Sequence, residues 1–142
     1  GEITTVDMAI ESSGRHNFGV IGPDKTPVVT LPGDPVAAYI SFELFIRPMI
    51  RTMLGAATIH RPSIKAKLEK AIVSTGGNRS YIRAVLSEDG KSVLPLLSQG
   101  SSAQDEQATL SDANAFIAVP EGDSNISAGS AVTVVVLERR YI

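Results

Sequence analysis

The stretch Leu31-Pro32-Gly33-Asp34-Pro35 decides how the first part of this 142-residue chain folds, because it marks the start of a long helix. Asp34 suits the N-cap position, since its carboxylate can accept hydrogen bonds from amides of the first turn. Pro35 suits the first helical position, where its missing N–H leaves no hydrogen bond unmade. The apolar run from Val36 to Leu54 continues the helix, and Gly55 favours its end.

The apolar composition of this helix predicts that it belongs to a domain of which this chain contains only a part. A helix that is apolar on most faces is expected to be buried on most sides, with Glu43, Arg47 and Arg51 forming one narrow polar stripe at i, i+4 spacing. Pro48 removes one backbone hydrogen bond, so we expect a kink around Leu44–Arg47. One such helix and a few short strands cannot enclose a core. Residues 1–57 are therefore interpreted as the C-terminal part of an α/β domain.

Short strands are expected before the helix, at Val6–Ile10, Phe18–Ile21 and Pro27–Leu31, with a turn at Gly22–Lys25. Gly1 is not an initiator methionine. This favours a piece cut from a longer protein, although a processed terminus would give the same start.

The rest of the chain has the pattern of a small β domain. Apolar and charged residues alternate from Ile64 to Glu69, as in a half-buried strand. A polar segment at Ala103–Asp112 is compatible with a short helix. Turn residues separate the remaining strand-like runs, which are Tyr81–Leu86, Ser92–Leu97, Ala115–Val119 and Ala131–Leu137. Residues 58–142 are therefore expected to form an all-β, barrel-like domain, with a sandwich as the other possibility.

Composition excludes several classes of function. Hydrophobic residues make up 43% and charged residues 20%, which is typical of a folded globular chain. The net charge of -2 and the lack of a basic cluster argue against nucleic acid as a partner. No apolar run reaches the roughly 18 residues of a membrane span, so we expect no membrane partner and a cytoplasmic location. Without cysteine, and with His16 and His60 far apart and expected in solvated loops, no protein metal site is predicted.

Three features could bind an oxyanion, and each has a plainer interpretation. The turn from Pro32 to Pro35 offers a helix N-terminus and a glycine, Gly33, that permits close approach. It is equally a well-capped connection without a ligand, and the charge of Asp34 opposes an anion there. Arg83, among apolar strand residues, is either a pocket cation or a solvent-facing side chain. The loop Ser98–Ser102 is either an anion nest or an ordinary loop.

A resemblance unites these features. The run from Thr30 to Tyr39, with the following Ser41-Phe42-Glu43-Leu44-Phe45-Ile46-Arg47-Pro48, resembles the molybdopterin molybdenumtransferase family, which includes bacterial MoeA proteins and the E domain of gephyrin. Tyr81-Ile82-Arg83 and Ser98-Gln99-Gly100-Ser101 are similar to signatures of its β domain. The similar segments run in the same order from about Phe18 to the C-terminus.

The resemblance implies both a fold and a reaction. A molybdopterin-binding α/β domain would end with the proline-rich turn and helix, and a small β-barrel would follow. Members use adenylylated molybdopterin (molybdopterin-AMP), molybdate and Mg2+, release AMP, and form homodimers as full-length proteins. Catalytic roles are implied for Pro32, Pro35, Arg83 and Ser101, and ligand contacts for Gly33, Asp34, Arg83 and Ser101.

Two departures from the family pattern stand out. Asp34 replaces the usual asparagine, and the segment Ile10–Asn17 has Arg15 but none of the usual lysines. The family's Gly-Gly-Val-Ser stretch for the pterin does not occur in this chain. We therefore expect the chain alone to be inactive. The alternative function is a protein-interaction or dimer-geometry module of a gephyrin-like scaffold.

Overall fold

The chain folds into two compact units, Gly1–His60 and Arg61–Ile142, in a computed structural model. The structure describes residues 1–7, 15–74, 77–96, 112–123 and 125–138. Within these ranges no helix is long and apolar enough to cross a membrane.

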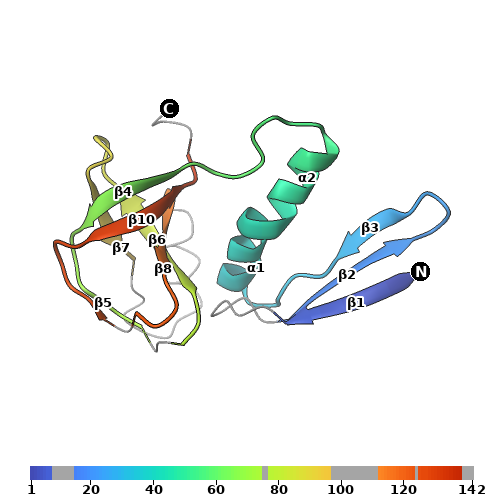
Figure 1. The fold of residues 1–142 in the computed structure, drawn as a ribbon, viewed down its shortest axis with the longest axis horizontal. Helices are drawn as coiled ribbons and strands as arrows, with labels where there is room; N and C mark the ends of the chain where they lie inside the picture. The colour runs from blue at the N-terminus through green and yellow to red at the C-terminus, as the bar shows by residue number, and fades with distance from the viewer. Residues whose placement is uncertain (8–14, 75–76, 97–111, 124, 139–142) are drawn as a thin grey trace. The chain divides into compact units, whose positions relative to one another are not determined.

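The first unit pairs a small antiparallel sheet with one helical rod (Figure 1). The sheet order is β1-β2-β3, with β2 in the centre. Strand β2 begins earlier than the sequence pattern predicts and so includes His16. The turn between β2 and β3 is closed by the Lys25 amide, which donates to the Gly22 carbonyl at 3.2 Å. The strands are β1 (Glu2–Asp7), β2 (Arg15–Ile21) and β3 (Thr26–Val29).

The expected kink is a local widening of the helix. Helix α1 (Pro35–Ser41) passes into a π-helical turn, η1 (Phe42–Ile46), and then into α2 (Arg47–Met53). The amide of Arg47 donates to the carbonyl of Phe42, five residues back. Pro48 follows directly and has no N–H to donate, so the wider turn accommodates the proline without ending the helix.

The prediction that the helix is buried on most sides is wrong for this chain. Ala37 and Ile40 are buried, but Met53 is 64% exposed and Leu54 is 78% exposed. A three-stranded sheet offers too little surface to cover a helix of five turns on more than one side. The polar stripe of Glu43, Arg47 and Arg51 does not lie wholly in solvent. Glu43 is buried, and its carboxylate lies 3.9 Å from the Arg47 guanidinium.

The second unit is a closed barrel with the strand order β10-β4-β7-β6-β8 (Figure 1). All neighbours are antiparallel except β4 and β7, which run parallel. A separate two-stranded ribbon pairs β5 with β9. The barrel prediction is confirmed, and closure removes the free sheet edges that an open sandwich would leave. The strands are β4 (Ser63–Leu68), β5 (Ile72–Val73), β6 (Ser80–Leu86), β7 (Ser92–Pro95), β8 (Ala115–Val119), β9 (Asn125–Ile126) and β10 (Ala131–Val136).

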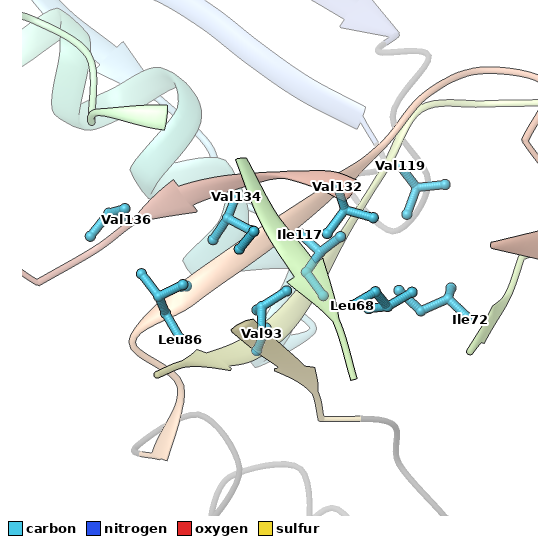
Figure 2. Packing of buried hydrophobic residues seen from close by; sticks show 12 residues of the cluster. Leu68, Ile72, Leu86, Val93, Ile117, Val119, Val132, Val134 and Val136 are labelled. Atoms are coloured by element: carbon cyan, nitrogen blue, oxygen red, sulfur yellow. The ribbon is translucent and has the colours of Figure 1, made fainter. Parts of the chain in front are cut away.

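Inward-facing aliphatic side chains fill the barrel (Figure 2). Ile117 and Val134 sit opposite each other on β8 and β10 and have no exposed surface. Val93 from β7 and Leu68 from β4 belong to the same cluster. β-Branched residues dominate because they suit both strand geometry and a small interior. The core thus lies inside the barrel, which leaves the outer face for other contacts.

Candidate functional site

The turn before the helix is a capped helix start. Asp34 has an extended backbone (φ -72°, ψ 127°), and its Oδ1 accepts from the Ala37 amide at 2.7 Å. A Cβ added at Gly33 would meet no atom within 4 Å, so packing within the chain does not demand glycine. The prolines on either side, Pro32 and Pro35, restrict the backbone. The Asp34 carboxylate is therefore engaged at the place where an oxyanion would sit.

Removing this cap is expected to destabilise the first unit modestly. Asp34→Ala deprives the Ala37 amide of its acceptor and should cost about 1 kcal/mol. Asp34→Asn keeps an acceptor oxygen and should stay within about 0.5 kcal/mol of the original chain, because both residues are good N-caps. Amide exchange of Val36 to Ile40, measured by NMR, would report both values. Equal losses in the two variants would show that the side-chain charge, rather than the cap, stabilises the helix.

Arg83 occupies an unusual place on the barrel. Its neighbours Ala84 and Ile82 point to the interior cluster, so strand alternation directs Arg83 to the outer face. The residue is nevertheless only 7% exposed. Phe116, its cross-strand partner on β8, also faces outward and has no exposed surface. Arg83 therefore matches neither sequence interpretation alone. Its side chain faces outward, as a solvent-facing residue would, but it is buried, as a pocket cation would be.

The structure does not bring the predicted site residues together. The turn from Pro32 to Pro35 belongs to the first unit and Arg83 to the second. Ser101 and the loop Ser98–Ser102 lie outside the described residues. Most of the predicted helix at Ala103–Asp112 lies outside them as well. A shared site built from these groups therefore stays a prediction.

Sequence reasoning missed a buried polar pair in the first unit. His16, expected in a solvated loop, has no exposed surface, and its Nε2 lies 2.8 Å from the Oγ of buried Ser41. Its ring stacks on Phe18 at 6.4 Å between centroids and meets the edge of Phe45 at 5.7 Å. Within the described residues, Nδ1 has no hydrogen-bond partner. The i, i+2 pairing of His16 with Phe18 on an apolar strand was the available signal.

No cluster of metal ligands accompanies these groups. In the described part of the chain, no three histidine, aspartate or glutamate side chains gather closely enough to hold an ion. His60 is exposed, and His16 is already engaged with Ser41.

Comparison with known proteins agrees with this architecture. Residues 65–137, just over half of the chain, match the family model described as the MoeA C-terminal region (domain IV). The crystal structure of the molybdopterin biosynthesis MoeA protein from Pyrococcus horikosii superposes with a TM-score of 0.78 at 25% identity. That superposition covers 97% of this chain and 32% of the archaeal one. The fold of the matched region is therefore shared.

Two curated relatives come from the bacterium Mycobacterium tuberculosis. Molybdopterin molybdenumtransferase 1 of Mycobacterium tuberculosis is 33% identical over 141 residues, which are 96% of this chain and 33% of that protein. Molybdopterin molybdenumtransferase 2 of the same organism is 38% identical over 109 residues, which are 77% of this chain and 26% of that protein. This chain spans only about a quarter to a third of these relatives. Because the family match reaches every strand of the barrel, the chain belongs to the MoeA C-terminal region (domain IV) family.

Proposed function

We propose that this chain is part of a molybdenum insertase, which transfers molybdate onto adenylylated molybdopterin with release of AMP. The observation that carries the proposal is Arg83, a buried arginine on the outer face of the barrel that the family match covers. The names of the bacterial relatives give the reaction class. As a third of such a protein, this chain would be inactive alone.

The chemistry proposed for Arg83 is electrostatic. A guanidinium has five N–H donors, so it can bind an anion while it keeps a contact within the protein. Molybdate is a tetrahedral oxyanion, and a fixed, poorly hydrated cation binds such a group more strongly than a solvated one does. A preorganised donor would hold molybdate against the dithiolene of the pterin without reorganising during the transfer.

The turn from Pro32 to Pro35 is proposed to shape the space for a ligand and not to supply a charge that binds it. Its prolines restrict the backbone, and the space beside Gly33 leaves room for a ligand to approach. The Asp34 carboxylate already accepts from the helix amide, so an oxyanion is expected beside the turn and not on the helix axis. Ser101, whose role is implied by the resemblance alone, is proposed to add a hydroxyl donor for the molybdate that Arg83 binds.

The first unit is proposed to be the end of the molybdopterin-binding α/β domain. Its helix leaves Ile50, Met53 and Leu54 exposed on one side, as expected of an element that packs against further structure. No group of three or more metal-ligating side chains is found among the described residues, and no step of the proposed reaction is assigned to magnesium. Cytoplasmic location and a homodimer of the full-length protein remain part of the same proposal.

Molybdate binding tests the proposal directly. Titration calorimetry of this chain with molybdate, and with sulfate as the control oxyanion, is expected to show binding that prefers molybdate. Arg83→Ala should weaken it about tenfold or more, because a charge-assisted hydrogen bond contributes about 1.5 to 3 kcal/mol. Arg79→Ala, which removes an exposed arginine just before the same strand, is the matched control and should bind normally.

Equal binding by the Arg83→Ala and Arg79→Ala variants would contradict the role of Arg83. The alternative function, an interaction or dimer-geometry module, is favoured by the exposed apolar side chains at the end of the helix. Concentration-dependent self-association in sedimentation experiments, together with no molybdate binding, would support that alternative.

A further inference from the structure

A hollow on the outer face of the barrel lies apart from the residues assigned to molybdate. Its volume is about 350 Å³, and neither Arg83 nor any residue of the first unit lines it. Pockets of roughly 300 to 1,000 Å³ hold small-molecule ligands, so this hollow is at the lower end of that range.

Small side chains on neighbouring strands create the floor of the hollow. Lys65, Thr133 and Ala118 lie side by side on β4, β10 and β8. Ala131 lies two residues before Thr133 on β10 and therefore faces outward as well. The two alanines fill little space between their longer neighbours, so the outer face is recessed here. The recess therefore follows directly from the strand register.

The rim of the hollow is polar and held in place. Its side chains come from the connection between β8 and β10, and they include Asp123, Asn125, Ser127 and Ser130. The Ser130 amide donates to the Ser127 carbonyl at 3.2 Å. Strand β9, which carries Asn125, pairs with β5 next to the buried barrel core. The backbone that carries these hydroxyl and amide groups is therefore held by hydrogen bonds.

Two opposite charges face this hollow without neutralising each other. The Lys65 Nζ donates to the Thr133 hydroxyl at 2.8 Å, which leaves two N–H groups for another acceptor. Asp123 is exposed on the rim. Among the described residues, no ion pair joins Lys65 to Asp123. A simple anion would be attracted to Lys65 but repelled by Asp123, whereas a ligand that carries both charges could satisfy both groups.

We propose that this hollow binds a small zwitterion, namely a free α-amino acid with a short side chain. The carboxylate would accept from Lys65 and the nearby hydroxyl groups, and the ammonium group would donate to Asp123. The alanine methyls and Ile126 would contact the short side chain. This site is independent of the proposed molybdate reaction, and it would give the barrel a second ligand of a different chemical class.

Amide chemical shifts measured by NMR provide the test, with L-alanine as the probe. Propionate carries only the carboxylate of alanine, and ethylamine carries only the ammonium group. Alanine is expected to shift the amides of Asn125, Ser127 and Thr133 with a Kd on the order of 1 mM, as suits so small a ligand. Each half-molecule should bind at least about tenfold more weakly, since it satisfies only one of the two charges.

Variants of the chain complete the test. Lys65→Met and Asp123→Asn should each weaken alanine binding about tenfold. Lys67→Met removes the next outward lysine on β4, which does not line the hollow, and should leave binding unchanged. Unchanged spectra away from the hollow would show that the fold is intact. The proposal is overturned if alanine at about 20 mM produces no shifts, if propionate binds as well as alanine, or if all three variants bind alike.

Discussion

His16→Ala is expected to destabilise the first unit by about 3 to 5 kcal/mol, a large share of the stability of a small domain. The imidazole has no exposed surface and packs between the rings of Phe18 and Phe45. Its removal leaves a cavity between β2 and the helix. It also leaves the buried Ser41 hydroxyl without the partner that lies 2.8 Å away. The cavity and the unsatisfied hydroxyl add to the cost.

Hydrogen exchange of β2 and α1 amides would measure this effect, because it reports the free energy of local opening. His60→Ala is the matched control, since His60 is exposed, and it should change stability by no more than about 0.5 kcal/mol. Ser41→Ala removes only the hydroxyl and should fall between the two. A His16→Ala variant as stable as His60→Ala would mean that the ring is not packed as the structure describes.

Local patterns predicted much of the fold. Asp34 and Pro35 placed the helix start correctly, because capping depends on neighbours along the chain. Alternation placed β4, and the apolar run Ala115–Val119, predicted as a strand between turn residues, matches β8 residue for residue. These signals are strong because each one depends on a few adjacent residues.

Non-local pairing explains what the sequence did not predict. The ribbon of β5 and β9 has two residues in each strand, too few for a periodic pattern. The burial of His16 depends on a helix that lies 25 positions further along the chain. The spacing of His16 and Phe18 on one strand face was a signal for burial, but it does not identify the helix residue, Phe45, that also contacts the ring.

The candidate site was predicted less completely than the fold. Strand alternation places Arg83 on the outer face, but its burial there could not be inferred from the sequence. The same holds for Phe116 opposite it, because an outward position on a barrel strand usually meets solvent. The hollow beside Lys65 also arises from register across three strands, which one strand's sequence does not reveal.

Ile117→Ala is expected to destabilise the barrel by about 2 to 5 kcal/mol. Ile117 has no exposed surface, and β8 contacts both β6 and β10, so its side chain lies at the centre of the cluster in Figure 2. A barrel wall that is hydrogen-bonded on both sides cannot easily collapse into the space left behind. The loss should therefore lie well above the transfer free energy of the deleted atoms alone.

Three substitutions of increasing or altered burial test whether the loss of stability comes from packing at Ile117. Ile117→Val removes one methyl group and should cost about 0.5 to 1.5 kcal/mol. Leu94→Ala, on the outward face of β7 and 40% exposed, should cost less than Ile117→Ala because solvent fills the vacated space. Denaturant unfolding followed by circular dichroism would rank the three variants. Equal losses for Ile117→Ala and Leu94→Ala would contradict an interior packed around β8, and with it the closed barrel that holds Arg83 in place.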